Sequence, residues 1–236
     1  MKAMVLAAGR GTRLKPHTDT IPKPMMPVAG RPLLEHIFEQ IRAAGIADIV
    51  VNLHHRPEVI QNYFRDGGRH NIRLTYSFEP DLLGTAGAVL KLAAEFTETF
   101  LVYYGDNYVE LDLPDLIRSH RQSKSDATIA VFSCEEPHRS GIVQADDSGR
   151  IFNFVEKPDP EIDVGRLANA GVYVLEPKVI PVIPAGRAVD FGRDIFPELI
   201  RNHFFLQAYP LRAAVYGIDT PELHARLVRH LAERTN

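Results

Sequence analysis

The stretch Leu6-Ala7-Ala8-Gly9-Arg10-Gly11-Thr12-Arg13-Leu14 closes a short apolar run that begins at Met4. Such a run is typical of a buried strand, and the two glycines after it allow backbone N–H groups to approach a phosphate closely. The pattern is not the dinucleotide fingerprint, because Leu14 stands where the third glycine would be. It also lacks the Gly-Lys-Ser/Thr ending of a Walker loop. We therefore expect a phosphate-facing turn between a strand and a helix.

Short β-branched runs alternate with amphipathic segments through the first half of the chain. This alternation is the pattern of βαβ units around a mostly parallel sheet. After the first strand, strands are expected at 49–53, 72–78, 100–104 and 127–132. Helices are expected at 32–44, 57–64, 87–96 and 113–122. The predicted fold class is α/β, with a Rossmann-like mixed, mostly parallel sheet flanked by helices.

The pattern changes after Cys134. Residues 141–144 and 151–155 flank Asp147-Ser148-Gly149 and predict a hairpin, and 171–175 predicts another strand. The last helix begins with Thr220 as N-cap and Pro221 at its first position. We expect one domain over 1–236, made of a part at 1–135, a small β-rich lobe at 136–176 and a segment at 177–236 that completes the core.

Composition excludes several classes of protein. The 236 residues carry a net charge of -3 and a single cysteine, so neither a basic field for nucleic acid nor an internal disulfide is expected. The apolar start is too short for a signal peptide, and no run approaches the ~20 apolar residues of a membrane span. These features predict a cytoplasmic protein that binds neither nucleic acid nor membranes. The ten histidines show no metal-ligand spacing, and His54-His55 is more typical of a polar strand end.

Two basic residues accompany the glycine-rich turn. Arg13 lies within it, and Lys23 follows between Pro22 and Pro24, which stiffen the backbone around the lysine. An arginine fork and a lysine point charge that converge on a glycine loop suit a polyphosphate. Taken singly, each residue is more typical of a solvated basic loop.

Together these residues resemble the signature of the sugar nucleotidyltransferases. The resemblance extends from Leu6-Ala-Ala-Gly-Arg-Gly-Thr-Arg-Leu14 through Pro22-Lys23-Pro24-Met25 to Pro32. It implies the nucleotide-diphospho-sugar transferase type of fold, with 1–135 binding nucleotide and 136–176 binding sugar. It also implies that Arg13 and Lys23 are catalytic and grip the triphosphate. The nucleotide-binding residues that it implies are Leu6, Ala8, Gly9, Gly11, Thr12, Glu79, Gly84 and Thr85.

The resemblance further implies a magnesium site. Tyr104-Gly105-Asp106-Asn107, at a strand's carboxyl end, is similar to the metal-binding Gly-Asp of the family. Many members end in Asp-Ile-Gly-Thr-Pro, whereas this chain has Gly217-Ile218-Asp219-Thr220-Pro221. Asp219 is therefore expected as the second ligand, since Mg²⁺ between phosphates takes one or two carboxylates. The alternative is that Asp219 only places negative charge at the N-terminus of the last helix.

The sugar-binding residues come from the second half of the chain. By resemblance, Gly141 allows the sugar to approach the backbone, and Asn169 completes the sugar pocket. Glu156 would hold sugar hydroxyls and Lys157 the sugar phosphate. Otherwise, Glu156-Lys157 would be an ordinary exposed ion pair worth under ~1 kcal/mol.

The implied reaction joins a nucleoside triphosphate to a sugar 1-phosphate and releases pyrophosphate. Two motifs, Leu83-Gly84-Thr85-Ala86-Gly87 and Asp190-Phe191-Gly192-Arg193-Asp194, most resemble those of mannose-1-phosphate guanylyltransferases. This resemblance implies GTP and a mannose- or heptose-type sugar 1-phosphate. Uridylyl, thymidylyl, adenylyl or cytidylyl transfer to another sugar 1-phosphate stays open, as does a homo-oligomer. Two rival classes also stay open: a choline- or alditol-phosphate cytidylyltransferase, and a non-catalytic nucleotide-sensing regulatory subunit.

Overall fold

The computed structural model describes residues 1–212 and 214–235, which form two compact units. The first unit comprises 1–82, 103–110 and 215–236, and the second comprises 83–102 and 111–214. The predicted division at 135 and 176 stays a prediction.

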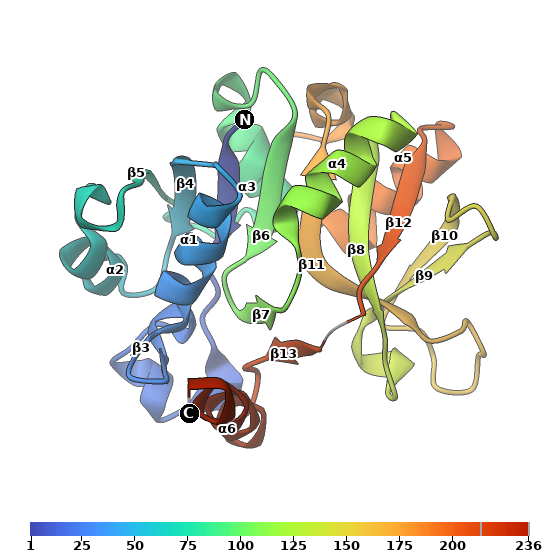
Figure 1. Ribbon diagram of the computed structural model, residues 1–236. Coiled ribbons are helices and arrows are strands. Elements are labelled where there is room, and N and C mark those ends of the chain that lie inside the picture. Colours follow the sequence, from blue (N-terminus) through green and yellow to red (C-terminus); the bar gives the residue numbers. More distant parts are fainter. Residues whose placement is uncertain (213, 236) are drawn as a thin grey trace. The chain divides into compact units, whose positions relative to one another are not determined.

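Parallel strands form the centre of the first unit. β1 (Ala3–Leu6) pairs with β4 (Asp48–Leu53), and β4 pairs with β5 (Arg73–Phe78), all in parallel. The register places Leu6 opposite Asn52, so that β1 and β4 end side by side (Figure 1). Because the chain leaves parallel strands at one edge of the sheet, the glycine-rich turn after β1 and the loop after β4 are neighbours.

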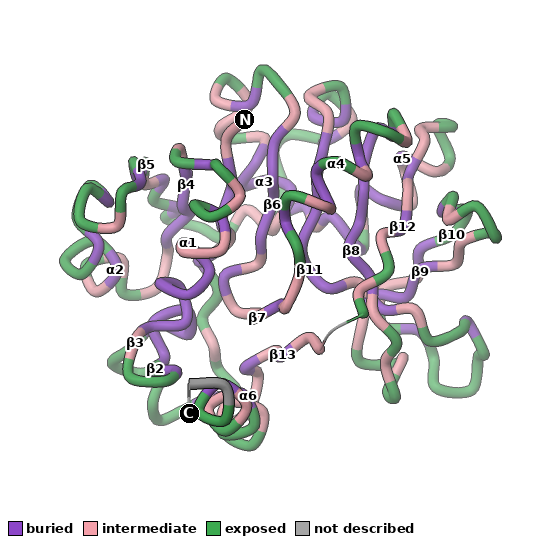
Figure 2. The backbone as a smooth tube through the Cα atoms, in the orientation of Figure 1, coloured by how far each residue is buried: buried purple, intermediate pink, exposed green. Residues whose placement is uncertain are grey.

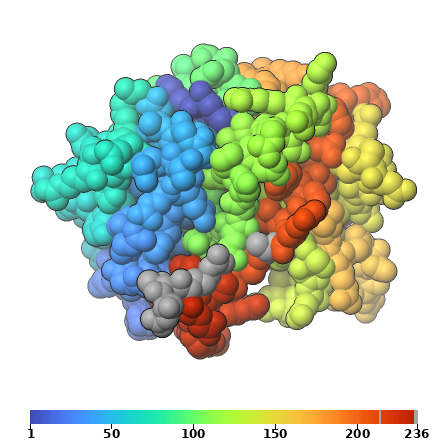
Figure 3. All heavy atoms as spheres, in the orientation of Figure 1, coloured from blue at the N-terminus to red at the C-terminus, as the bar shows by residue number. Residues whose placement is uncertain are grey.

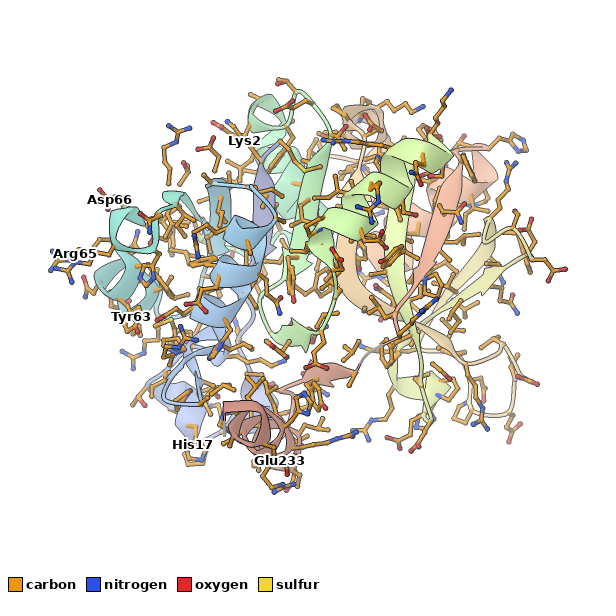
Figure 4. The ribbon with its side chains drawn as sticks, in the orientation of Figure 1. Lys2, His17, Tyr63, Arg65, Asp66 and Glu233 are labelled. Atoms are coloured by element: carbon orange, nitrogen blue, oxygen red, sulfur yellow. The ribbon has the colours of Figure 1, made fainter. Side chains whose placement is uncertain are left out.

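The first unit also contains α-helices. They are α1 (Leu33–Ala43), α2 (Pro57–Phe64) and α6 (Pro221–Thr235). Phe38 of α1 meets the ring of Phe64 of α2 edge-on at 4.9 Å between centroids, and the two helices form a continuous surface in the space-filling view of Figure 3. Tyr63 extends from α2 (Figure 4), and its hydroxyl donates to Glu35 of α1 at 2.7 Å.

Short elements complete the first unit. Three single 3₁₀ turns follow the glycine-rich loop: η1 (Thr12–Leu14), η2 (His17–Asp19) and η3 (Lys23–Met25). A fourth, η4 (Gly68–His70), precedes β5. Two small antiparallel pairs join β2 (Pro27–Val28) to β3 (Arg31–Pro32) and β7 (Asn107–Val109) to β13 (Val215–Gly217). The second pair brings a segment from the end of the chain against the residues that follow Asp106.

The second unit has a mixed sheet. β11 (Leu167–Leu175) pairs antiparallel with both β8 (Ala127–Ser133) and β9 (Gly141–Ala145), and β9 pairs with β10 (Ile151–Glu156) as the expected hairpin. β12 (Leu206–Pro210) pairs in parallel with β8. The strand β6 (Phe100–Tyr104) begins in this unit and ends in the first. The remaining elements are α3 (Gly84–Lys91), η5 (Ala93–Glu95), α4 (Leu113–Ser123), η6 (Pro137–Arg139), η7 (Pro177–Val182), the π-helical turn η8 (Phe191–Ile195) and α5 (Phe196–Arg201).

Many buried apolar residues of both units lie on the strands, as the purple segments of Figure 2 show, and others lie on helices, such as Leu34 and Ile37 of α1. The expected α/β class, with a mixed, mostly parallel sheet and flanking helices, is confirmed. No helix in the described part of the chain is both long enough and apolar enough to cross a lipid bilayer.

Two sequence predictions need correction. The helix expected at 87–96 begins at Gly84 and ends at Lys91, followed by the separate turn η5. Its early start depends on a distant residue, because the N–H groups of Ala86 and Gly87 donate to the carbonyl of Val189. The short strands β7 and β12 were not predicted. Their hydrogen-bond partners lie far along the chain, so local sequence carries little signal for them.

Candidate active site

The start of the glycine-rich loop is held from both sides. The carbonyl oxygen of Leu6 accepts a 2.9 Å hydrogen bond from the N–H of Gly105, at the end of β6. The N–H of Ala7 donates at 2.7 Å to the side-chain Oδ1 of Asn52, at the end of β4. Ala8 is buried, whereas Gly9 and Thr12 are exposed. The loop therefore leaves the sheet at a fixed point and presents its next residues to solvent.

Gly11 packs against the residue that follows the loop. Its φ of +60° lies in the left-handed region, and a Cβ there would come within 3.0 Å of Lys23 Cβ and 2.9 Å of Thr18 Cγ2. The buried Thr18 also donates from its hydroxyl to the carbonyl of Gly11 at 2.8 Å. A side chain at position 11 would strain the backbone and would also displace Lys23. Both effects favour glycine at this position.

Lys23 joins two carboxylates from distant parts of the chain. Its Nζ lies 2.6 Å from Asp106 Oδ2, after β6, and 2.6 Å from Asp219 Oδ1, after β13. The lysine side chain is only 6% exposed, against 37% and 35% for the two aspartates. Burial by itself lowers the pKa of Lys23, but the two carboxylates outweigh it and raise that pKa above 10.5. The ammonium therefore stays charged.

Arg13 contacts the same cluster from the solvent side. Its NH2 donates at 2.8 Å to Asp219 Oδ1, the oxygen that also accepts from Lys23, and its side chain is 64% exposed. The four side chains Arg13, Lys23, Asp106 and Asp219 form what we call the charge cluster. Two positive and two negative charges balance within it, beside the glycine-rich loop.

The charge cluster fits a divalent cation. A single Lys23 nitrogen lies at hydrogen-bonding distance from an oxygen of each carboxylate, so both oxygens already converge on one cationic centre. Among residues 1–212 and 214–235, no group of three or more His, Cys, Asp or Glu side chains could hold a metal ion. Two carboxylates suit Mg²⁺ that also binds phosphate oxygens and water.

The last helix has a side-chain N-cap at the residue that follows Asp219. The expected N-cap, Thr220, receives a hydrogen bond on its hydroxyl from the N–H of Leu223 at 3.4 Å. Asp219 instead turns toward Asp106 through their shared contact with Lys23. The exchange of glycine and aspartate around Ile218 therefore still delivers a carboxylate to the charge cluster.

Glu79 is buried beside the loop. It is 1% exposed, and its Oε1 accepts a 2.9 Å hydrogen bond from Nδ2 of Asn52. Its carbonyl oxygen lies 2.8 Å from His54 Nδ1, and Nε2 of that histidine accepts from Arg10 at 3.3 Å. Both links lead from Glu79 back to the glycine-rich loop.

Gly84 and Thr85 lie in the second unit and contact the segment before η8. Gly84 has φ +77°, and a Cβ there would come within 2.4 Å of the Val189 carbonyl oxygen. Oδ1 of Asp190 accepts from the N–H of Thr85 at 3.1 Å and from its hydroxyl at 3.3 Å. This start of α3 is therefore fixed by residues more than a hundred positions later.

Glu156 lies between two glycines of the second unit. A Cβ at either Gly141 or Gly192 would come within 2.6 Å of Glu156 Oε2, and at Gly141 also within 2.6 Å of the ring of Phe154. Burial raises the pKa of Glu156, with Lys157 opposing the shift. The two glycines leave room for this carboxylate.

Lys157 directly follows Glu156, and Asn169 lies on β11. Lys157 has φ +48°, its N–H donates to the Ser140 carbonyl at 3.0 Å, and its side chain is 68% exposed with Nζ 3.9 Å from Glu156 Oε1. Asn169 donates to the Tyr173 hydroxyl at 2.7 Å and accepts from the N–H of Gly171 at 2.8 Å. Asn169 thus holds an irregularity in β11, where its register shifts.

The structure brings the predicted residues together in two sets. The loop residues, Glu79 and the charge cluster belong to the first unit, whereas Gly84, Thr85, Gly141, Glu156, Lys157 and Asn169 belong to the second. No site role was predicted for Asn52, Asp190 or Gly192, although the last two lie in a motif that resembles the guanylyltransferases. The glycine in Asp190-Phe191-Gly192 was a usable signal for the last two, but Asn52 carries none because its role depends on two distant partners.

A comparison with known families matches residues 2–215 to the nucleotidyl transferase family. A UTP–glucose-1-phosphate uridylyltransferase of Synechocystis is 41% identical over 214 residues, covering 85% of this chain and 55% of that protein. A mannose-1-phosphate guanylyltransferase of Mycobacterium tuberculosis is 38% identical over 202 residues, with the same two coverages. The chain thus spans about half the length of the curated relatives it matches.

Solved structures share the fold over nearly the whole chain. A putative glucose-1-phosphate thymidylyltransferase from Bacillus anthracis in complex with a sucrose has a TM-score of 0.89, 22% identity, and coverage of 98% of this chain and 94% of that one. HddC from Yersinia pseudotuberculosis complexed with GMP-PN has a TM-score of 0.81, 27% identity, and coverage of 98% and 99%. The first match shows the fold alone.

Proposed function

Because the chain belongs to the nucleotidyl transferase family, we propose that it transfers a nucleotidyl group from a nucleoside triphosphate to a sugar 1-phosphate and releases pyrophosphate. The observation that carries the proposal is the convergence of Lys23 on Asp106 and Asp219, with Arg13 on the same Asp219 oxygen. This cluster lies in the same unit as a glycine-rich loop whose start is fixed by Gly105 and Asn52.

The reaction requires positioning more than acid–base chemistry. A sugar-phosphate oxygen attacks the α-phosphorus, a new P–O bond forms, and the bond to the bridging oxygen breaks as pyrophosphate leaves. A phosphate monoester has a second pKa of about 6, so the nucleophile is already ionised at neutral pH. The remaining requirement is to hold two anions together and to neutralise the charge that moves onto pyrophosphate.

The proposed roles follow from charge. Asp106 and Asp219 would hold Mg²⁺, which when bound neutralises phosphate charge and orients the phosphates. Lys23 and Arg13, which balance those carboxylates in the structure, would turn their charge to the triphosphate. Lys157 would bind the phosphate of the acceptor, and Glu156 the hydroxyls of its sugar. The loop residues of the first unit would bind the nucleotide, and the same role is proposed for Gly84 and Thr85 of the second unit. Gly141 and Asn169 would shape the sugar pocket.

For the substrates, we propose GTP and a mannose- or heptose-type sugar 1-phosphate. Support comes from the guanylyltransferase relative and from the GMP-PN complex of HddC. A second candidate is uridylyl transfer to glucose 1-phosphate, which the 41% identical relative favours. The cytoplasmic location remains part of the proposal, because both substrates are intracellular metabolites.

The test is an assay of the purified chain that measures pyrophosphate release. Each common nucleoside triphosphate is combined in turn with mannose, heptose and glucose 1-phosphates and with choline and alditol phosphates. Release that needs Mg²⁺ and is fastest with GTP and a mannose- or heptose-type acceptor is expected. Turnover only with choline or alditol phosphates would replace the sugar acceptor. Nucleotide binding without turnover on any acceptor would point to a sensing subunit instead.

A further inference from the structure

A buried amide links the glycine-rich loop to Glu79. Asn52 is 4% exposed at the end of β4, and its two polar side-chain atoms have two different partners. Oδ1 accepts from the N–H of Ala7 at 2.7 Å, and Nδ2 donates to Glu79 Oε1 at 2.9 Å. Both partners are themselves buried, at 2% and 1% exposure. Two hydrogen bonds thus connect the Glu79 carboxylate through the Asn52 side chain to the backbone of the loop.

The bond to Ala7 lies just beyond the regular sheet. The β1–β4 register ends at Leu6 opposite Asn52, so Ala7 is the first residue past it. On the other side, the carbonyl of Leu6 accepts from the N–H of Gly105. A buried backbone N–H without a hydrogen-bond partner is strongly unfavourable, so the Asn52 side chain largely determines where the loop begins.

Glu79 is held firmly enough to orient Asn52. Its N–H donates to the Leu53 carbonyl at 2.7 Å, and its carbonyl oxygen lies 2.8 Å from Nδ1 of His54. The carboxylate can only accept hydrogen bonds, so it selects the amide nitrogen of Asn52 and leaves the amide oxygen for Ala7. The acceptor at position 79 therefore fixes which way the amide points.

We propose that Asn52 is a positioning residue for the nucleotide and that Glu79 acts through it, orienting the amide that fixes the glycine-rich loop. This inference rests on the proposed function, since the loop is taken to hold the triphosphate. It assigns Glu79 a role different from contact with the base. Neither residue would touch the reacting atoms.

Exchanging the hydrogen-bond donor and acceptor between positions 52 and 79 tests whether Glu79 acts through Asn52. In N52D the new carboxylate can still accept from Ala7 but faces Glu79, so two buried acceptors oppose each other and one must move or take a proton. In E79Q the amide oxygen can still accept from Asn52. In N52D/E79Q the glutamine amide donates to the aspartate, which still accepts from the N–H of Ala7. Both hydrogen bonds therefore return, and only the bond between positions 52 and 79 has its donor and acceptor exchanged.

Steady-state kinetics should separate the variants. N52D is expected to lower kcat/KM for the triphosphate by about 10²-fold, the effect of a misplacement of about 1 Å, while KM for the sugar phosphate changes little. E79Q should stay within a few-fold of wild type, and the double variant should recover to the level of E79Q. N153D, the same substitution at an exposed asparagine of β10 that donates to Gln144, is the matched control and should behave as wild type.

Hydrogen exchange of the Ala7 amide gives a readout that needs no turnover. It should be slow in wild type, faster in N52D and slow again in N52D/E79Q. Severe loss in E79Q with no recovery in the double variant would overturn the inference and favour direct contact of Glu79 with the base. If wild type releases no pyrophosphate with any substrate pair, the proposed function fails, whereas the exchange rates still test the link between Asn52 and Ala7.

Discussion

Lys23 Nζ and Asp219 Oδ1 lie 2.6 Å apart although 196 residues separate them in the chain. The same nitrogen lies 2.6 Å from Asp106 Oδ2, so the ammonium bridges the two carboxylates expected to bind Mg²⁺. Lys23 is also the residue expected to grip the triphosphate. It cannot fully neutralise both the carboxylates and the phosphates, so its partners must change when a metal-bound nucleotide arrives.

The first prediction concerns metal binding without nucleotide. K23Q should bind Mn²⁺ roughly tenfold or more tightly than wild type, because the nearby positive charge that repels the metal is removed. Titration followed by electron paramagnetic resonance of Mn²⁺ measures this affinity directly. K15Q is the control, since Lys15 forms an exposed pair with Asp19 at 3.2 Å and should leave metal affinity unchanged. Equal affinities in K23Q and wild type would contradict the bridging role.

Loss of the Lys23 charge should also impair turnover. K23A is expected to lower kcat by roughly 10²-fold or more, because a fixed charge no longer faces the charge that develops on pyrophosphate. Its melting temperature without metal should also fall, since the buried lysine holds two carboxylates together. R13K should likewise be poorly tolerated, because a point charge does not replace the planar fork. Full kcat/KM in K23A would show that the cluster is not catalytic.

The second ligand can be tested against helix capping. D219N should lose activity steeply and recover in part at higher Mg²⁺, as expected for a weakened metal site. T220A removes the observed N-cap and should cost about 0.5–2 kcal/mol of stability with no change in Mg²⁺ dependence. Activity against Mg²⁺ concentration and thermal unfolding distinguish the two. If D219N has a lower melting temperature but the same dependence of activity on Mg²⁺ concentration as wild type, Asp219 has a structural role and is not a metal ligand.

Lys157 should act on the acceptor alone. K157A is expected to raise KM for the sugar phosphate about tenfold or more, because one charge-assisted hydrogen bond is worth ~1.5–3 kcal/mol, and to leave KM for the triphosphate nearly unchanged. The matched control is K178A, which removes another exposed lysine of the second unit that pairs with Asp126. Equal effects of K157A on both substrates would remove Lys157 from the acceptor site.

A glycine-to-alanine substitution beside Glu156 tests whether the position of this carboxylate matters for binding the sugar phosphate. G192A places a Cβ within 2.6 Å of Glu156 Oε2, so the carboxylate must move and KM for the sugar phosphate should rise, as in E156Q. G68A is the control, because a Cβ there meets only Asp66 at 3.3 Å, in the first unit. As for K157A, the KM for the sugar phosphate is compared with the KM for the triphosphate. An unchanged acceptor KM in both G192A and E156Q would show that this carboxylate does not bind the sugar.

His120 should make stability depend on pH. It is buried on α4, with Nδ1 2.8 Å from Thr128 Oγ1 and Nε2 3.0 Å from Glu176 Oε1. Burial lowers the pKa of His120 below 6.5, against the opposing effect of Glu176. The unfolded chain therefore binds this proton at higher pH than the folded chain does, and stability should fall as pH drops through about 6.5. Denaturant unfolding at pH 8 and pH 5.5 should show a smaller difference in H120Q than in wild type.

The sequence by itself determined the local features. Gly9 and Gly11 indicated a close backbone turn, and Pro57 to Phe64 has the bounds of α2 as predicted. Thr220 and Pro221 marked the start of the last helix correctly. These features depend on φ preferences, caps and periodicity, which are properties of residues and their immediate neighbours.

Only the tertiary structure decided which side chains meet. Lys23 pairs with Asp106 and Asp219, which lie 83 and 196 positions later in the sequence. Its burial could not be predicted, because a lysine in a proline-flanked loop is by itself expected to be exposed. Asn52 looked like one more residue of a strand, yet it connects Ala7 with Glu79. Such contacts follow from the order and register of strands, because the sheet brings the ends of β1, β4 and β6 to one edge whatever their separation in sequence.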